Sequence, residues 1–396
     1  MSLAGGRELV AIPGPSVIPD RVLAAMHRAM PDIYGDDLLE VSDEIYAALP
    51  RVAGMPADGR VFVTISNGHG AWEMAISNTL SRGDEVLVLE SGRFAVTWGE
   101  MAAFSGVKTE VLHAPDRCPV DPAAVQSRLQ ADVTHQIKAI FMVYTDTASS
   151  VMNDIVAVRR AVDAAGHPAL LMVDCIASMG SEKFLMAEWG VDLALAASQK
   201  ALMVPPGLGF VWAGPRALAA HATADLRTGY FDWSARTLAG AHYLRYCGTM
   251  PVSHLYGLRE ALIMISEEGL ENVWARHAVL AGAVRAAVGA WATPGGIELN
   301  VLDPAGRSNA VTTILTGSID ATRLSDICRV QAGLTLGAGI GDFMGKAFRI
   351  GHMGHVNPPM ILGALGTVEA ALLTMGAPLG GSGVAAAAAH IGAHLR

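Results

Sequence analysis

Short apolar runs alternate with amphipathic segments up to about residue 255. Residues 61–65 and 137–144 are apolar runs of strand length, whereas residues 153–165 repeat their apolar positions at helical spacing. Buried strands separated by such helices are typical of a mainly parallel sheet that is covered on both faces. We therefore expect an α/β domain with strands at 61–65, 85–89, 109–112, 137–144, 169–173, 191–196 and 210–213, and helices at 20–30, 40–55, 71–80, 98–104, 122–130 and 153–165.

The pattern changes after about residue 255, where apolar residues are spaced for long helices. Helices are expected at 255–268, 271–290 and 359–373, with strands at 310–315 and 347–351, which indicates a smaller α+β domain. We predict four parts: an N-terminal arm (1–20), a large domain (21–255), a small C-terminal domain (256–375) and a tail (376–396). The tail is rich in glycine and alanine, so we expect at most a loosely held helix there and assign it no function.

Composition argues against several kinds of partner. The chain has 396 residues, and its net charge of −9 is spread without a basic cluster, which argues against nucleic acid or an anionic membrane. It contains neither an apolar run long enough for a membrane-spanning helix nor a visible secretory leader. The four cysteines are widely spaced and form no Cys-x-x-Cys pair. We therefore expect a cytoplasmic protein without a disulfide framework or a metal site.

One lysine stands out because its neighbours are so apolar. Lys200 follows the strand-like run at 193–197 and precedes a turn through Pro205, Pro206 and Gly207. Burial would lower the pKa of its amine, and a neutral lysine is a nucleophile that can form a Schiff base with a carbonyl compound. The alternative is an ordinary surface lysine at the end of a strand.

Two further features could bind a ligand. Asp174 follows the apolar run at 169–173, at the carboxyl end of a predicted parallel strand, where open α/β sheets bind ligands. It could equally be a helix cap or a loop residue. The turn at 66–70 lies between a strand and a helix, where backbone N–H groups favour an anion, although such turns are common. Together, a lysine amine, a carboxylate for a pyridinium nitrogen and an anion cradle fit pyridoxal 5′-phosphate.

Longer motifs carry a resemblance to a known family. The chain resembles the fold-type I, class V aminotransferases of the alanine–glyoxylate and serine–glyoxylate (serine–pyruvate) group. The resemblance implies a seven-stranded, mainly parallel sheet in the large domain, and a homodimer with shared active sites. It is carried by segments 67–73, 173–180, 198–202, 249–252, 255–260, 268–272 and 345–351.

The resemblance also implies roles for individual residues. Lys200 would bind the cofactor covalently and move the proton of the substrate, and Asp174 would keep the pyridine nitrogen protonated. Phe94 would stack on the ring, and Arg349 would bind the substrate carboxylate beside Gly14. The other matching positions are Asn67, Gly68, His69, Thr147 and Gln199 at the cofactor, Tyr246 and Thr249 at the phosphate in the neighbouring subunit's site, and Tyr34 at the substrate.

The chain departs from the family pattern near the substrate. Residues 33–35 are Ile-Tyr-Gly where relatives often have His-Arg-Ser, and Ser149-Ser150 replaces Thr-Gly. Arg93 stands beside the stacking aromatic, where it could meet a second carboxylate or point into solvent. These changes leave the cofactor chemistry intact and leave the amino donor open.

We expect transamination from serine or alanine, with aspartate as a further candidate, to glyoxylate or pyruvate. One alternative is a pyridoxamine–pyruvate aminotransferase, which the altered Tyr34 region leaves open. A lyase or desulfurase of the same class would need a cysteine beside the site, and the cysteines here do not match that placement. A non-catalytic vitamer-binding or regulatory protein would leave the lysine and Arg349 without a purpose.

Overall fold

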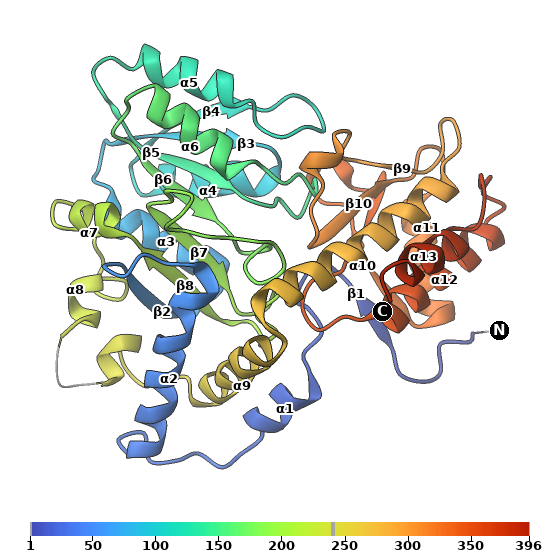
Figure 1. Ribbon diagram of the computed structural model, residues 1–396, viewed down its shortest axis with the longest axis horizontal. Coiled ribbons are helices and arrows are strands. Elements are labelled where there is room, and N and C mark those ends of the chain that lie inside the picture. Colours follow the sequence, from blue (N-terminus) through green and yellow to red (C-terminus); the bar gives the residue numbers. More distant parts are fainter. Residues whose placement is uncertain (1, 239–241, 396) are drawn as a thin grey trace.

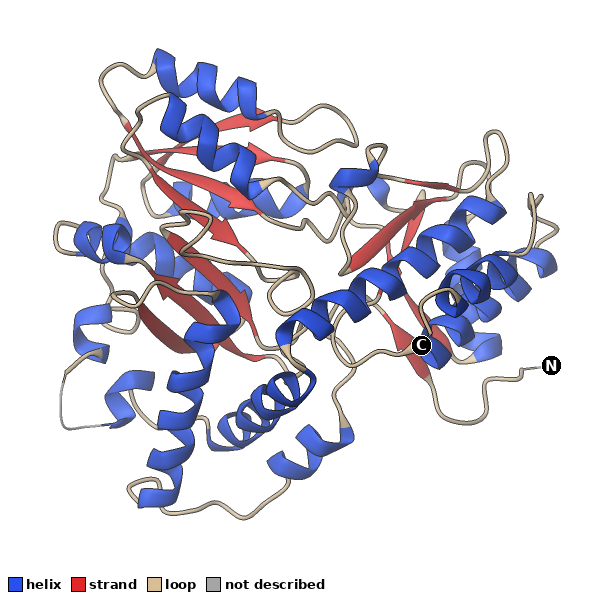
Figure 2. Cartoon of the chain, in the orientation of Figure 1, coloured by secondary structure: helices blue, strands red, loops and turns tan. Residues whose placement is uncertain are grey.

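The computed structural model describes residues 2–238 and 242–395, and the strands in this part of the chain form two sheets (Figures 1 and 2). The large sheet contains, in spatial order, β2 (Arg60–Ser66), β8 (Gly207–Ala213), β7 (Leu193–Ala197), β6 (Leu170–Asp174), β5 (Ile137–Val143), β3 (Glu85–Glu90) and β4 (Lys108–His113). The small sheet contains β1 (Leu9–Ala11), β11 (Leu334–Ala338), β12 (Ala347–Gly351), β10 (Val311–Leu315) and β9 (Glu298–Leu299).

The large sheet is mainly parallel, as the sequence predicted. From β4 to β7 all neighbouring strands are parallel, whereas β8 is antiparallel to both β7 and β2. The carboxyl ends of β5, β6 and β7 therefore meet at one edge. In the register, Val143 pairs with Asp174, and Asp174 pairs with Leu195.

Helices cover both faces of the large sheet, because successive strand residues point to opposite sides. In β6, Leu171 and Val173 belong to one hydrophobic core, whereas Leu170 and Met172 belong to another. The first core is completed by α2 (Asp36–Ala53), α5 (Pro122–Ala131), α6 (Ile155–Ala164) and α9 (Val252–Glu268), and the second by α3 (Gly68–Thr79), α4 (Arg93–Phe104) and α7 (Pro215–His221). The short helices α1 (Asp20–Met26) and α8 (Trp233–Arg236) lie at the margin of this part (Figure 1).

The small sheet has a hydrophobic core of its own. This core is formed with α10 (Leu270–Trp291), α11 (Ala321–Asp326), α12 (Pro358–Thr374) and α13 (Gly383–Gly392). Strand β1 brings the N-terminal arm into this sheet by pairing in parallel with β11. Among the described residues, no helix has both the length and the apolar character needed to cross a membrane.

The elements differ from the prediction in a few places. Helix α1 ends at Met26 rather than at residue 30, and α2 begins at Asp36 rather than at residue 40. The tail forms a helix, α13, as expected, but the helix is not loosely held: Ser382 caps it, and the side chains of Ala387 and Ile391 are buried in the core of the small sheet. Strands β1, β9 and β11 were not predicted.

Candidate active site

Lys200 lies just beyond the carboxyl end of β7, next to the N-terminal arm. Its Nζ donates a hydrogen bond to the carbonyl of Pro13, and a side chain at Gly14 would collide with the lysine. Ser16 fixes the arm from the other side, since its Oγ donates to the Lys200 carbonyl over 2.6 Å. Burial, and then the positive charge of Arg349, lower the pKa of the Lys200 amine to about 8. An appreciable fraction of the amine is therefore neutral near physiological pH.

Asp174 ends β6 with its carboxylate buried. Oδ2 accepts a hydrogen bond of 2.8 Å from the indole of Trp72, and Oδ1 accepts one of 2.6 Å from the backbone of Ile176. Burial outweighs these bonds and raises the pKa of the carboxyl group to about 7. A cationic ligand nitrogen would reverse this effect, because it would stabilise the ionised form.

The turn after β2 leads directly into α3. Asn67 is the N-cap, and its Oδ1 accepts hydrogen bonds from the amides of His69 (3.0 Å) and Gly70 (3.4 Å). Gly68 packs so closely on Ile176 that a β-carbon would collide with it. The helix N-terminus thus faces the segment that carries Asp174, in an orientation that favours an anion.

A cavity of about 230 Å³ joins these three features. Two polar atoms on its wall, Gln199 Oε1 and Thr145 Oγ1, are buried and lack a hydrogen-bond partner in the described part of the chain. Such atoms indicate that a polar ligand completes the site. The lining residues are Asn67, Gly68, His69, Trp72, Phe94, Val143, Thr145, Thr147, Asp174, Ile176, Ala177, Gln199 and Lys200. An amine, a buried carboxylate, aromatic rings and an anion-binding helix terminus match the donor set that pyridoxal phosphate requires.

Arg349 approaches the site from the small sheet. It lies on β12, is 7% exposed, and donates from Nε to the Ala338 carbonyl (2.7 Å) and from Nη1 to the Thr147 carbonyl (2.8 Å). Burial lowers the pKa of its guanidinium group to about 10. The bond to Thr147 brings Arg349 to the margin of the cavity, and its remaining N–H groups could bind a carboxylate.

Besides Gly14 and Arg349, three predicted residues lie outside the cavity lining. Tyr34 is 72% exposed in the segment before α2, and Thr249 is exposed just before α9. Tyr246 is fully buried, and its hydroxyl is hydrogen-bonded to Ser42 Oγ over 2.7 Å. A buried side chain that is already paired cannot reach a phosphate in a neighbouring subunit without moving.

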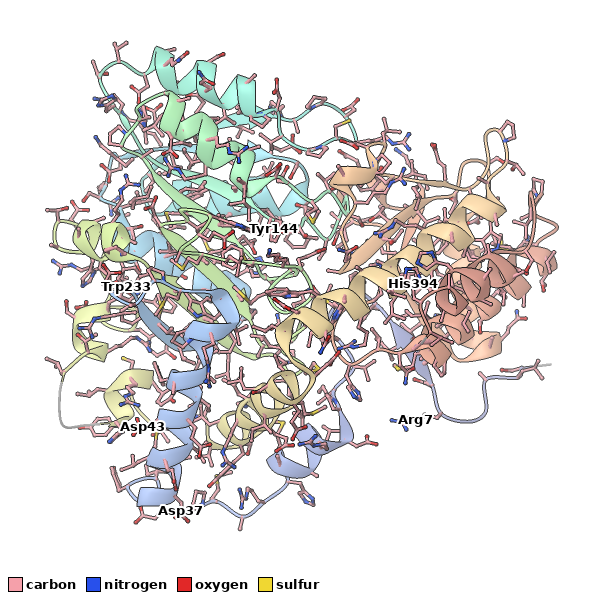
Figure 3. All side chains as sticks on the ribbon, viewed as in Figure 1. Arg7, Asp37, Asp43, Tyr144, Trp233 and His394 are labelled. Carbon is pink, nitrogen blue, oxygen red and sulfur yellow. The ribbon has the colours of Figure 1, made fainter. Side chains whose placement is uncertain are left out.

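Other residues of the site were not singled out from the sequence. Trp72 holds Asp174, and Thr145 presents its hydroxyl to the cavity. Asp146 is fully buried, and its carboxylate accepts hydrogen bonds from the backbone of Phe94 (2.7 Å) and Ala148 (2.8 Å). The apolar run before these residues extends through Tyr144, which lies in the interior of the molecule (Figure 3) and donates its hydroxyl to the Lys183 carbonyl. A polar segment directly after a buried strand was the signal that could have pointed to them.

Comparison with known proteins agrees with this geometry. The family model described as aminotransferase class-V matches residues 14–342. The chain is 41% identical to a serine–glyoxylate aminotransferase of Methylorubrum extorquens, over 98% of this chain and 96% of that protein. It is 38% identical to an L-aspartate–glyoxylate aminotransferase of Paracoccus denitrificans, over 96% and 95% of the two chains.

A solved structure extends the similarity to the whole fold. The pyridoxamine–pyruvate aminotransferase of Mesorhizobium loti superposes with a TM-score of 0.89 at 26% identity, and all of both chains is covered. The resemblance seen in the sequence motifs is thereby confirmed, as is the fold-type I architecture. The family model matches most of the chain, and a lysine and a carboxylate face one cavity. The chain therefore belongs to the class-V aminotransferase family, whose members depend on pyridoxal phosphate.

Proposed function

We propose that this aminotransferase transfers the amino group of a small amino acid to glyoxylate or pyruvate, using pyridoxal phosphate bound by Lys200. Serine or alanine is the expected donor, and aspartate is a further candidate. The observation that carries the proposal is that the Lys200 amine and the Asp174 carboxylate line one cavity, with Arg349 at its margin. The serine–glyoxylate and L-aspartate–glyoxylate relatives support the choice of substrates.

The residues would divide the work as follows. When bound, the cofactor supplies a reactive carbonyl carbon and a ring that withdraws electrons. Lys200 would hold the cofactor and then, as a base, move a proton from the substrate α-carbon. Asp174, held by Trp72, would accept the hydrogen bond of the protonated ring nitrogen. Phe94 would cover the ring, and the other proposed contacts are Asn67, Gly68, His69, Thr147 and Gln199.

The substrate would lie between the arm and the small sheet. Arg349 would bind its carboxylate, because a guanidinium group matches that planar shape. Gly14 would leave room beside Lys200, since any side chain there would collide with the lysine. A fixed carboxylate would in turn hold the α-carbon near the base.

We further propose that the active unit is a homodimer with shared sites. Thr249 and Tyr34 are exposed on this chain and lie outside its own cavity lining, so each is free to contact a second copy. Thr249 would reach the phosphate and Tyr34 the substrate of the neighbouring site. Tyr246 would join them only if its bond to Ser42 broke.

A second candidate activity is supported by one comparison. The solved pyridoxamine–pyruvate aminotransferase covers the whole chain at a TM-score of 0.89, so the fold is compatible with a free vitamer as the donor. Its identity of 26% is lower than the 41% shared with the serine–glyoxylate enzyme, which favours an amino-acid donor.

A donor screen tests both activities. Purified enzyme loaded with pyridoxal phosphate is mixed in turn with serine, alanine, aspartate and pyridoxamine, and the visible absorbance band is followed. We expect the band to bleach with an amino acid and to return when glyoxylate is added. The variant Lys200→Ala should fold, as judged by circular dichroism, and show no turnover. Full turnover by that variant would refute the proposal. Conversion of pyridoxamine and pyruvate to pyridoxal and alanine by the enzyme without bound cofactor would favour the second activity.

A further inference from the structure

Beside the cavity, a buried turn contacts both the large and the small sheet. It comprises residues 146–150, hereafter the 146–150 turn, and follows β5 of the large sheet. The amide of Ser150 closes it by donating to the Asp146 carbonyl over 2.7 Å. The turn carries the Thr147 carbonyl that accepts the hydrogen bond of Arg349. The position of the turn therefore sets one of the two anchors of the guanidinium group.

The large sheet holds the turn on one side. The Asp146 carboxylate accepts bonds from three backbone amides, and one of them, that of Phe94, belongs to the first turn of α4. Ser149 donates from Oγ to the Ser91 carbonyl over 2.8 Å. These contacts fix the beginning of the turn relative to α4 and to the cavity wall.

On the other side, the turn is held by a pair of hydroxyl groups and by Asn300, whose Nδ2 donates to the Ser149 carbonyl over 2.8 Å. Ser150 Oγ lies 2.6 Å from Thr313 Oγ1, and Thr313 Oγ1 lies 3.0 Å from the Ala148 carbonyl. The Thr313 hydroxyl has one proton, which it donates to Ala148, so Ser150 donates to Thr313. Thr313 lies on β10 directly opposite Arg349 on β12. The chain Ser150–Thr313–Ala148 thus joins the turn to the strand next to Arg349.

A serine at position 150 requires a strained backbone conformation. Its φ angle is 65°, in the left-handed region that favours glycine. A glycine would adopt this conformation with less strain, but it could not donate to Thr313. The side chain is 3% exposed and its hydroxyl bonds across the gap between the sheets. The interaction that offsets the strain lies next to the carboxylate-binding arginine.

We propose that Ser150, acting through Thr313, is a positioning residue for Arg349 and thereby tunes the affinity for the substrate carboxylate. The inference rests on the proposed function, because it takes Arg349 as the group that binds the substrate carboxylate. Loss of either hydroxyl loosens the contact between the turn and β10, and the Thr147 carbonyl is then held less firmly against the guanidinium group. Carboxylate binding weakens, while the cofactor contacts of Lys200 and Asp174 stay in place.

Four variants of the loaded enzyme separate positioning from stability. Ser150→Ala removes the bond between the two hydroxyl groups, Ser150→Gly removes it and relieves the strain, Thr313→Val removes it together with the bond to the Ala148 carbonyl, and Thr313→Ser keeps a hydroxyl. The dissociation constant of propionate is measured by calorimetry, since propionate is the alanine skeleton without its amino group. The KM for the best donor of the screen, the cofactor absorbance spectrum and the Tm are measured beside it.

We expect the dissociation constant and the KM to rise about fivefold in the two Ser150 variants, which is the effect of one hydrogen bond, and to rise further in Thr313→Val, which also loses the bond to the Ala148 carbonyl. Thr313→Ser should behave like the wild type, and the absorbance spectrum should not change in any variant. Ser150→Gly should have a higher Tm than Ser150→Ala and yet show the same loss of affinity. If Ser150 had a purely structural role, the affinity for propionate would instead change in parallel with the Tm.

The variant Arg349→Ala distinguishes two kinds of failure. If it loses propionate binding while Ser150→Gly and Thr313→Val bind like the wild type, the positioning role is wrong and the proposed function stands. If Arg349→Ala also binds propionate like the wild type, the arginine does not bind the carboxylate, and that part of the proposed function falls together with this inference.

Discussion

Burial acts on the two central ionisable residues in opposite directions. It lowers the pKa of Lys200 to about 8 and raises that of Asp174 to about 7, so each group is moved towards its neutral form. Among the residues that the structure describes, neither group forms a salt bridge, and each acts only weakly on the other. A pyridinium nitrogen would supply a partner of opposite charge for Asp174. Ionisation of Asp174 therefore destabilises the cofactor-free protein as the pH rises through about 7.

This effect predicts how stability depends on pH. The folded-state pKa of Asp174, about 7, exceeds its ordinary value of 3.8, so its contribution to stability is complete below pH 3.8 and is lost as the pH rises through 7. Asp174→Asn cannot ionise. We expect the Tm of the cofactor-free wild type, relative to that of this variant, to fall by roughly 3 °C between pH 5 and pH 8.

Scanning calorimetry on the two cofactor-free proteins across this pH range measures the difference. If asparagine fails to replace a hydrogen bond of Asp174, the Tm of the variant changes by an amount that is the same at every pH. Asp342→Asn, at an exposed position, is the control and should track the wild type at every pH. A constant difference between wild type and Asp174→Asn would contradict the raised pKa.

At the scale of single residues, the sequence located the groups whose position follows from the backbone. Lys200 and Asp174 stand at the carboxyl ends of strands, and a parallel sheet brings such ends together. The bond from Trp72 to Asp174 joins residues 102 positions apart, and no local pattern specifies such a contact. The burial of Tyr246 was missed for the same reason, because the direction of its side chain depends on packing against Ser42.

Among the elements, the C-terminal helix departs most from its prediction. A run of alanines has little apolar surface, so its sequence suggests a weak helix. The structure gives α13 three anchors: Glu369 on α12 accepts hydrogen bonds from the Ser382 hydroxyl and the Val384 amide, and Ile391 enters the core of the small sheet. The small side chains of α13 let this helix pack closely against α10. The sequence of α13 alone does not show this packing.

Shortening one buried side chain of α13 tests whether the helix contributes to stability. Ile391 is 4% exposed, so Ile391→Ala should lower the free energy of unfolding by about 2–4 kcal/mol through lost burial and the resulting cavity. Leu395→Ala, at a position that is 71% exposed, is the matched control and should change it by less than about 0.5 kcal/mol. Urea unfolding of both variants gives the comparison, and equal effects would show that α13 is not held as described.

Long-range pairing limited the prediction of the remaining elements. Strand β1 has three residues, and its partner β11 lies more than 300 positions later in the chain. The alternation that identified the large sheet is absent from such a short segment. The predicted fold class was nevertheless confirmed, because the parallel strands of the large sheet are long, apolar and separated by amphipathic helices.

On the scale of the whole molecule, the site depends on the contact between the two sheets. The arm runs from β1 in the small sheet to Lys200 beyond β7, and it packs so closely that a side chain at Gly337 or Gly351 would collide with Pro13 or Ile12. Arg349 crosses in the opposite direction to reach the 146–150 turn. A movement of one sheet relative to the other would therefore change the carboxylate site before the cofactor contacts.

The proposed dimer adds a second copy to this arrangement, and mixed dimers can test it. In Lys200→Ala the reactive amine is lost, whereas Thr249→Asp would place a negative charge against the phosphate of the neighbouring site. Each variant alone should have little activity. A dimer of one copy of each contains one site with both Lys200 and Thr249 intact, provided that Thr249 serves the neighbouring subunit. Random assortment of equal amounts should then restore about one quarter of wild-type turnover. If Thr249 serves its own chain, every site carries a defect, and mixing after unfolding and refolding would restore no activity.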